Sequence, residues 1–331
     1  LLHILLGLGF AAGILKVPMS TWQKHGQILF ILGLLLLFVV LLPGVGVRVN
    51  GSIRWLQIAG LRIQVSEVMK LISIVYMASY ITRHGDNVRN SAVGLLRPLV
   101  WFSIACVLLL MEPDFGSAVV IVIIAMGMMF LGGARISQFV VLLGLVSVLA
   151  VILVKTSPYR LARVMSFSDP WADAKNTGFQ LTQALISFGR GEFFGVGLGN
   201  GIQKLFYLPE AHTDFLFSVL GEELGLLGVV SVIALFSVLI YRAFIIGANA
   251  EKREQPFSAL VAYGLGIWFG FQSFVNMGVN MGMLPTKGLT LPLMSYGGGS
   301  MIVMCGAMAL LFRIQYELNG GTSRPVSGVN L

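Results

Sequence analysis

Long apolar runs, separated by shorter polar segments, set the pattern of the whole chain. Nine of these runs come near the length that an α-helix needs to cross the hydrocarbon core of a bilayer. They lie at residues 1–16, 28–43, 66–82, 98–112, 115–132, 136–154, 214–241, 257–279 and 299–316. The pattern predicts an all-α polytopic membrane protein, with residues 1–331 as a single transmembrane domain.

Two of the polar segments predict structure of their own. Residues 53–65 alternate apolar and polar positions around Ala59 and Gly60, which is typical of a short hairpin or interfacial ribbon. Residues 155–213 form the largest segment between runs. Within it, residues 179–188 have the spacing of an amphipathic helix, which would lie on the membrane or pack over a cavity.

The positions of Lys and Arg orient the spans. Short cytoplasmic loops carry an excess of these residues, so we place the basic loop at 83–97 and the tail after Arg313 in the cytoplasm. Residues 155–213 and 280–298 then lie outside. The segment 155–213 is therefore predicted to be a large extracytoplasmic loop ahead of the span that starts at Asp214.

Composition supports the membrane assignment and narrows the function. Hydrophobic residues make up 56% of the chain and the mean hydropathy is +0.88, well beyond a soluble domain. The net charge of +8 is assigned to basic loops beside anionic lipids or to an anionic lipid substrate, because no basic patch interleaved with aromatics favours nucleic acid. Cys106 and Cys305 lie in apolar runs and are predicted to be small buried hydrophobes.

Ionisable side chains gather just ahead of the span that begins near Asp214. A carboxylate at a helix N-terminus is stabilised in its ionised form, which suits a base that must accept a proton. An aspartate that only caps the helix is the ordinary alternative. The same outer segment carries cations that would favour a pyrophosphate-bearing substrate, and these are Arg160, Arg163, Arg190 and Lys204.

Other charged positions leave alternatives open. Glu67 and Lys70 stand three residues apart and share a helix face, so they form either an ion pair at a helix end or part of a substrate cavity. Glu222 and Glu223 are predicted to make polar contacts between packed helices. Residues 112–114 read as a solvated turn, and the glycine-dense segment 189–201 as a tightly turning loop without a phosphate-loop spacing.

Several sequence motifs resemble the SEDS family of membrane proteins, and nearly the whole chain takes part in the resemblance. The motifs are Leu-Pro-Glu-Ala-His-Thr-Asp-Phe at 208–215, Gly-Glu-Glu-Leu-Gly at 221–225, Glu-Pro-Asp-Phe-Gly at 112–116, Pro-Tyr-Arg at 158–160 and Leu-Pro-Thr-Lys-Gly-Leu-Thr-Leu-Pro-Leu-Met-Ser-Tyr-Gly-Gly-Gly-Ser at 284–300. Ala211 is more similar to the cell-division branch of the family than to its elongation branch. Val65 and Gly299 depart from the usual pattern.

The resemblance implies a fold of ten transmembrane helices with both ends in the cytoplasm. Nine spans are visible here, and the chain opens on Leu1 without a methionine or a secretory signal pattern. We therefore expect Leu1 not to be the natural N-terminus and the first helix of the family fold to precede it.

The resemblance also implies a peptidoglycan glycosyltransferase that polymerises lipid II into glycan strands during septal cell-wall synthesis. Asp214 matches the essential aspartate of the family and is expected to be the catalytic base. The bond formed would be β-1,4, with undecaprenyl pyrophosphate released. The expected substrate-binding residues are Glu67, Lys70, Arg160, Arg190, Lys204, Glu210, His212, Thr213, Lys287 and Ser295.

Partners and cofactors follow from the resemblance alone. They are a class B penicillin-binding protein of the FtsI transpeptidase type, the FtsQ, FtsL and FtsB regulators, and a divalent cation such as Mg²⁺ or Mn²⁺ whose ligands are unknown. The expected location is the bacterial inner membrane at the division septum. Two other functions stay open: a lipid II flippase, which makes no bond, and a non-catalytic scaffold of the division complex.

Overall fold

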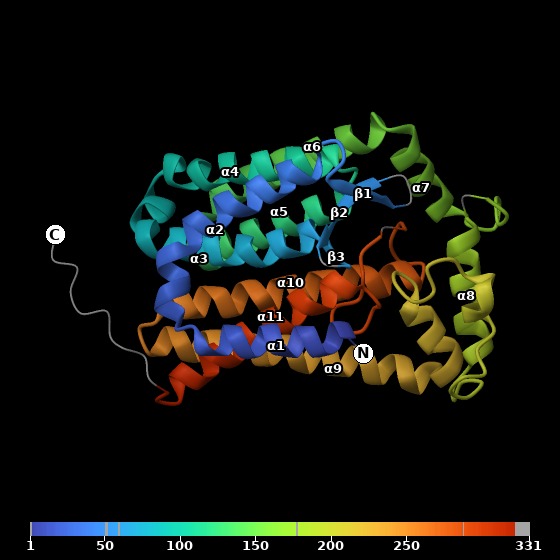
Figure 1. Ribbon diagram of the computed structural model, residues 1–331. Coiled ribbons are helices and arrows are strands. Elements are labelled where there is room, and N and C mark those ends of the chain that lie inside the picture. The colour runs from blue at the N-terminus through green and yellow to red at the C-terminus, as the bar shows by residue number, and fades with distance from the viewer. Residues whose placement is uncertain (1, 50–51, 59, 177, 287, 322–331) are drawn as a thin grey trace. The chain divides into compact units, whose positions relative to one another are not determined.

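The structure is a computed structural model, and it describes residues 2–49, 52–58, 60–176, 178–286 and 288–321. These residues form two compact units, which we describe separately (Figure 1). The first unit comprises Leu1–Gln138, Leu239–Trp268 and Gly298–Leu331. The second comprises Phe139–Val238 and Phe269–Gly297.

A helix covers each of the nine predicted spans in the part of the chain that the structure describes. The bounds are α1 Leu2–Lys16, α2 Met19–Val40, α3 Val65–Asn90, α4 Ala92–Met111, α5 Phe115–Leu131, α6 Ile136–Lys155, α9 Leu216–Lys252, α10 Pro256–Asn280 and α11 Gly298–Leu318. Seven of these are long and apolar enough to cross a membrane, while α1 and α5 are shorter apolar helices. The prediction of an all-α polytopic fold is confirmed.

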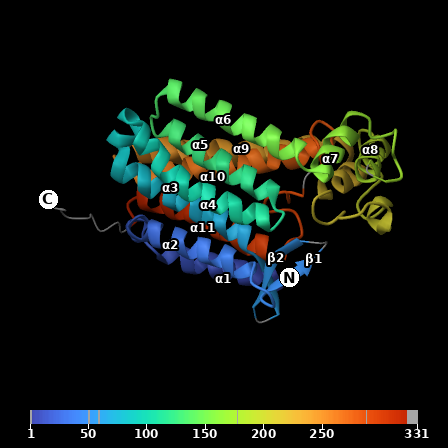
Figure 2. The same ribbon diagram turned by 90° about the horizontal axis from the view of Figure 1, so that it is seen from above.

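Helix α3 is the centre of the first unit. It contacts α2, α4 and α5, and the four helices lie side by side in both views (Figure 1 and Figure 2). Small residues allow the close approach of α2, because a Cβ added at Gly33 would lie 2.7 Å from the sulfur of Met69. The Phe30 ring then stacks 4.4 Å from the Tyr76 ring, centroid to centroid.

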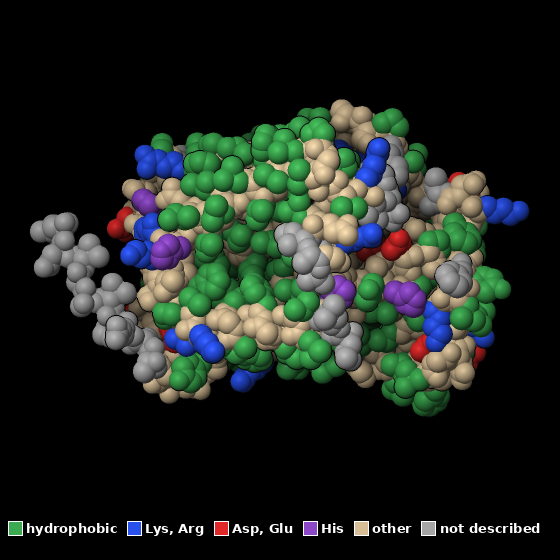
Figure 3. Space-filling view, viewed as in Figure 1, with side chains coloured by type: hydrophobic (Ala, Val, Ile, Leu, Met, Phe, Trp, Pro, Cys, Tyr) green, Lys and Arg blue, Asp and Glu red, His purple; other side chains and the backbone are tan. Residues whose placement is uncertain are grey.

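The outer surface of the first unit is suited to lipid. Figure 3 shows hydrophobic side chains covering the middle of the visible helices, while Lys, Arg and His side chains lie away from this middle region, toward both ends. Exposed apolar residues on α2 and α4 account for part of this cover, among them Leu35, Phe38, Val100 and Val107. Such a belt is expected where lipid tails replace water.

A small antiparallel sheet follows α2 and precedes α3. Strand β2 (Ser52–Ile58) pairs with β3 (Leu61–Gln64), so the predicted hairpin is confirmed, although residue 59 of its turn lies outside the described residues. Strand β1 (Gly46–Val49) also pairs with β2 and was not predicted. Its four residues are too few to show an alternating pattern.

The second unit contains the outer segment. Helix α8 (Phe179–Gly191) confirms the predicted amphipathic helix, with Leu181 and Ala184 buried. Helix α7 (Pro158–Ser168), which begins at a proline, was not predicted. A short π-helix, η1 (Gln203–Tyr207), then leads toward the start of α9.

Helix α9 is much longer than a bilayer requires. Its 37 residues correspond to about 55 Å at 1.5 Å per residue, against a hydrocarbon core of about 30 Å. The helix is broken at Gly225, where φ is 61°. The residues after the break are enough to cross the membrane, so the break lies near the surface that the sequence predicts to be extracytoplasmic.

Candidate active site

The backbone around Asp214 is held by side chains from α10. Asn276 and Asn280, one helical turn apart, each donate a side-chain N–H to the carbonyl oxygen of Asp214, at 2.9 and 2.8 Å. Asn280 also accepts hydrogen bonds from the amide and hydroxyl of Ser218, at 3.0 and 2.7 Å. One asparagine therefore caps the start of α9 and fixes the residue that precedes it.

Asp214 lies where the sequence places it, two residues ahead of α9. Its carboxylate oxygen Oδ2 would be only 3.1 Å from a Cβ added at Gly288. Gly288 therefore lies directly beside the Asp214 carboxylate. Asn280 accepts a hydrogen bond from the amide of Ser218, so a side chain of α10 caps the start of α9.

The last outer loop, residues 281–297, supports the same stretch from another side. The hydroxyl of Ser295 donates to the carbonyl of Thr213 at 2.6 Å and accepts from the amide of Leu291 at 2.8 Å. The amide of Tyr296 donates to the carbonyl of His212 at 2.8 Å. Ser295 therefore orders the backbone next to Asp214, whereas its predicted contact with substrate stays a prediction.

Three other predicted residues lie on the stretch itself. Glu210 and His212 are exposed, and Thr213 is partly exposed. The hydroxyl of Thr213 donates to Glu210 Oε2 at 2.7 Å. The structure thus brings Glu210, His212 and Thr213 to the neighbourhood of Asp214, and Lys287 lies outside the described residues.

The predicted cations are directed to separate partners. Arg190 pairs with Glu222 at 2.7 Å, and Lys204 pairs with Glu223 at 2.5 Å. Arg160 donates to a carbonyl at the end of α6 at 2.9 Å. Arg163, which the sequence groups with them, reaches toward the last outer loop and donates to the carbonyl of Thr286 at 3.4 Å. Glu222 of α9 pairs with Arg190 of α8, so the predicted polar contact between helices is confirmed for Glu222. Both glutamates also accept hydrogen bonds from amides at the glycine-rich loop or its end.

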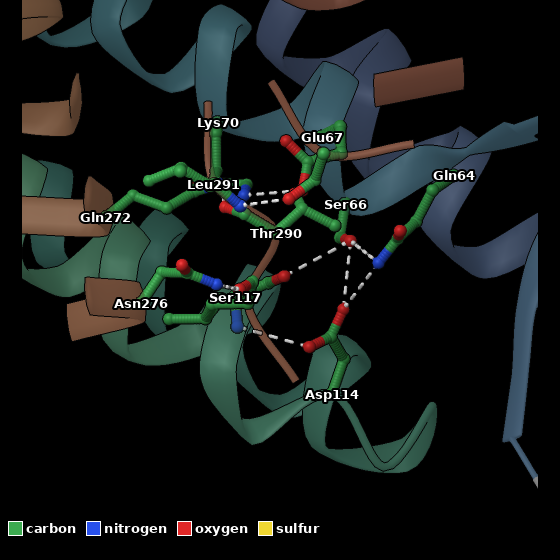
Figure 4. A network of polar contacts seen from close by, with 12 residues as sticks. Gln64, Ser66, Glu67, Lys70, Asp114, Ser117, Gln272, Asn276, Thr290 and Leu291 are labelled. Carbon is green, nitrogen blue, oxygen red and sulfur yellow. Dashed lines mark hydrogen bonds and ion pairs between the residues drawn. The ribbon is translucent and has the colours of Figure 1, made fainter. Parts of the chain in front are cut away.

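Glu67 and Lys70 belong to the first unit and form a buried ion pair of 2.7 Å (Figure 4). The ammonium nitrogen of Lys70 also lies 5.5 Å from the centroid of the Trp268 ring. The second carboxylate oxygen of Glu67 is buried and has no hydrogen-bond partner among the described residues. The ion pair is confirmed, and a role in substrate binding stays a prediction.

The turn between α4 and α5 is not solvated, so that prediction is wrong. Glu112 is 0% exposed and Asp114 is 3% exposed. Asp114 accepts hydrogen bonds from the hydroxyl of Ser66 at 2.9 Å and the amide of Ser117 at 3.1 Å, and these side chains converge in Figure 4. Arg54 of β2 donates to the carbonyls of Glu112 and Pro113 at 3.1 and 2.5 Å. The sheet therefore covers the turn.

Glu112 is the unusual member of this cluster. Neither of its carboxyl oxygens has a hydrogen-bond partner among the described residues. Burial, together with the nearby Asp114 carboxylate, raises the pKa of Glu112 from 4.5 to about 8, although Arg54 opposes the rise. The carboxyl is thus held in its neutral form at physiological pH.

The chain offers no dedicated metal cage in its described part. No group of three His, Cys, Asp or Glu side chains there has the spacing to hold a metal ion. Mg²⁺ commonly binds through one or two carboxylates together with substrate phosphates, so the expected cation would depend on the substrate.

Fold and site together define a polytopic membrane protein with a braced aspartate at the outer end of a long helix. The family model for FtsW, RodA and SpoVE, described as "cell cycle protein", matches residues 1–320. This chain belongs to that family.

Curated relatives carry the name "probable peptidoglycan glycosyltransferase FtsW". The protein from Methylomonas methanica is 73% identical over 318 residues, which cover 96% of this chain and 82% of the relative. The protein from Methylococcus capsulatus is 61% identical over 317 residues, which cover 96% of this chain and 80% of the relative.

Solved structures share the fold. One chain, from a study of "structural coordination of polymerization and crosslinking by a peptidoglycan synthase complex", is 27% identical with a TM-score of 0.79, covering 96% of this chain and 88% of that one. The rod shape determining protein RodA of Thermus thermophilus is 26% identical with a TM-score of 0.69, covering 96% and 86%. Both matches extend over almost all of the present chain.

Asn276 and Asn280 are the site residues that sequence reasoning missed. A signal was present, since two asparagines four residues apart inside an apolar span lie on one helix face. Glu112 carried no such signal, because its burial depends on a strand far away in the sequence.

Proposed function

We propose that this protein is a peptidoglycan glycosyltransferase that polymerises lipid II, with Asp214 as its catalytic base. The observation that carries the proposal is the bracing of Asp214. Three side chains, from Asn276, Asn280 and Ser295, hold the main chain at Asp214 or beside it, and the carboxylate lies next to Gly288. A backbone fixed in this way suits a base that must meet a substrate hydroxyl in one geometry.

In the proposed reaction, Asp214 takes the proton from the 4-hydroxyl of the GlcNAc of incoming lipid II. That oxygen attacks the anomeric carbon of the MurNAc at the end of the growing strand. The bond from this carbon to pyrophosphate breaks, and the α-linked donor gives a β-1,4 product by inversion. Undecaprenyl pyrophosphate leaves with the electron pair, so no second carboxylate has to protonate it.

Cations near the leaving pyrophosphate would stabilise its developing charge. The candidates are Arg160, Arg190, Lys204 and Lys287, with Mg²⁺ or Mn²⁺ as a further proposal. Arg190 and Lys204 already pair with glutamates, so they would bind pyrophosphate only by sharing or exchanging those partners. Loss of polymer on chelation, restored by Mg²⁺, is the result expected if the ion takes part.

The similarity to a chain of a peptidoglycan synthase complex supports a crosslinking partner. We propose a class B penicillin-binding protein for this role, together with the FtsQ, FtsL and FtsB regulators. The division septum of the inner membrane is the proposed location. The relatives named FtsW support the division branch over the elongation branch.

Polymerisation of lipid II in detergent, with the transpeptidase partner present, tests the proposal. Wild-type protein should make glycan strands, and Asp214→Asn should lower the rate by about 10²-fold or more, since a general base contributes about 10²–10⁴. Asp86→Asn, near the C-terminal end of α3, is the matched control and should keep the wild-type rate. Polymer made by Asp214→Asn at the wild-type rate would overturn the assignment.

The same assay separates the rival functions. Detergent micelles have no two sides, so a flippase would give no product in them. A scaffold would support division in cells even as Asp214→Asn, whereas the enzyme would localise normally and fail to divide the cell.

A further inference from the structure

The break in α9 exposes backbone groups that need partners. A helix that stops and restarts frees carbonyl oxygens before the break and amides after it. Near or inside a membrane such groups must bond within the protein. At Gly225, with φ of 61°, the missing partners come from another segment of the second unit.

The glycine-rich loop between α8 and η1 fills the break. It donates amides to the carbonyls that precede Gly225 and offers carbonyls to the amides that follow it. The four hydrogen bonds are Val196 N to Glu222 O at 3.0 Å, Gly197 N to Glu223 O at 3.0 Å, Leu226 N to Glu192 O at 2.9 Å and Leu227 N to Phe193 O at 3.3 Å. The loop therefore replaces the missing helical hydrogen bonds.

The side chain of Glu222 joins the two ends of this loop. Its carboxylate is completely buried and accepts from Arg190, in the last turn of α8, at 2.7 Å. It also accepts from the amides of Ile202 and Gln203, at the start of η1, at 3.1 and 3.2 Å. A single carboxylate thus closes the loop at both ends and fixes it to α9.

The hydrogen bond from Gln203 to Glu222 also closes a ring of the polypeptide chain that contains Asp214. From Gln203 the chain runs through η1, passes Asp214 and returns along α9 to Glu222, about twenty residues in all. Closing a ring of this size restricts the conformations of every residue within it. Asn276 and Asn280 hold the ring from α10 at Asp214 itself, while Glu222 fixes the side by which the chain enters.

We propose that Glu222 and Arg190 are positioning residues for Asp214. They hold the glycine-rich loop in the break of α9, and the loop in turn sets where the stretch 203–213 enters the active site. The inference rests on the proposed function of Asp214, although its structural part does not. Neither residue needs to touch substrate.

Hydrogen exchange tests the structural part without any activity. In the Asp214→Asn background, adding Glu222→Gln removes the charge and one acceptor while keeping the side-chain shape. Amides of residues 196–213 should then exchange about tenfold faster, with α11 unchanged. Unchanged exchange in 196–213 would show that Glu222 does not hold the glycine-rich loop, whether or not the protein polymerises lipid II.

Steady-state kinetics test the functional part. Glu222→Gln in otherwise wild-type protein should lower kcat by about 10- to 100-fold with KM within about twofold, because small misplacements of a reacting group have large effects on rate. Arg190→Ala should lower kcat in the same way, and Arg190→Lys should recover part of the lost rate. Glu251→Gln, at the far end of α9 where Glu251 accepts from Tyr263, is the control and should behave as wild type.

The outcomes are separable. A wild-type kcat in both Glu222→Gln and Arg190→Ala would contradict the positioning role of these residues, and the proposal that Asp214 is the base would be unaffected. If Glu222→Gln does not fold, Arg190→Ala still tests the positioning role, because Arg190 is half-exposed and its substitution disturbs the fold less. Absence of polymer from the wild-type protein would instead count against the proposed function, and the exchange result would stand.

Discussion

Glu112 and Glu222 are two glutamates that are both fully shielded from solvent, yet their surroundings differ in kind. Glu222 accepts hydrogen bonds from a guanidinium and two main-chain amides. Glu112 has no partner for either oxygen among the described residues. A buried carboxyl can thus be satisfied as an anion or kept as a neutral acid, and the number of donors decides which.

The first prediction concerns the satisfied glutamate and has the largest expected effect. Glu222→Leu leaves the Arg190 guanidinium and the amides of Ile202 and Gln203 without an acceptor. Each buried donor that is left without an acceptor costs about 1–3 kcal/mol of unfolding free energy, and the half-exposed Arg190 guanidinium adds less than a buried charge would. Thermal or denaturant unfolding in detergent, followed by tryptophan fluorescence, measures it.

Arg190→Leu combined with Glu222→Leu is the control for this prediction. Removing both charges should recover part of the loss, because no unpaired guanidinium then remains. A Glu222→Leu protein as stable as wild type would mean that the carboxylate contributes nothing net to the fold.

The second prediction concerns the unsatisfied glutamate and pH. The raised pKa of Glu112, about 8 against an ordinary 4.5, means that the folded state holds a proton that the unfolded state releases. Its contribution to stability is complete below about pH 4.5 and is lost as pH rises through about 8. Glu112→Gln stays neutral, so it should lack this loss, and its stability advantage over wild type should grow by about 2–3 kcal/mol between pH 6 and pH 9.

Unfolding curves of wild type and Glu112→Gln at pH 6 and pH 9 give the test. The stability difference between the two proteins should already be present at pH 6 and should be larger at pH 9. Arg54 and Asp114 are the charged groups that face Glu112. Asp114→Asn should therefore lower the pKa of Glu112 and narrow the pH range over which its contribution to stability is lost. Parallel pH profiles for wild type and Glu112→Gln would contradict a neutral Glu112.

The comparison of Glu112 with Glu222 also shows which features of the structure can be predicted from the sequence. Hydrophobic periodicity located the nine apolar helices, the hairpin at 53–65 and the amphipathic helix α8, because each of these depends on residues close together in the chain. The same reasoning placed Asp214 at a helix start. Local patterns therefore carried most of the fold and the position of the candidate base.

What sequence reasoning missed depends on residues that are distant in the chain. Glu112, Pro113 and Asp114 have the composition of a solvated turn, yet the two carboxylates are buried and Arg54, from a strand far away in the sequence, donates to the backbone of the turn. The break at Gly225 lies inside an unbroken apolar run, and the loop that fills it comes from residues about thirty positions earlier. Contacts between residues so far apart in the sequence produce no periodic pattern of apolar and polar positions.

The third prediction tests the brace on Asp214. Asn280→Ala removes a donor to the Asp214 carbonyl and the acceptor for the amide and hydroxyl of Ser218, all buried. Leaving such groups unsatisfied costs about 1–3 kcal/mol, so unfolding should shift by that amount and polymerisation should slow. Ser237→Ala is the control, since that exposed hydroxyl only donates to the carbonyl of Ile233. Equal effects of the two substitutions would remove Asn280 from the site.

The smallest effect is expected at Glu223, next to Glu222 on the same helix. Its ion pair with Lys204 is partly exposed, with side chains 12% and 25% accessible, and its carboxylate also accepts a hydrogen bond from the amide of Gly199. Exposed pairs are worth about 0–1 kcal/mol, so Glu223→Gln should change the unfolding free energy by no more than that. A double-mutant cycle with Lys204→Gln should give a coupling of similar size that falls as salt is added. If Glu223→Gln were instead as damaging as Glu222→Leu, burial and donor number would not be what separates the two neighbours, and the comparison of Glu112 with Glu222 would lose its basis.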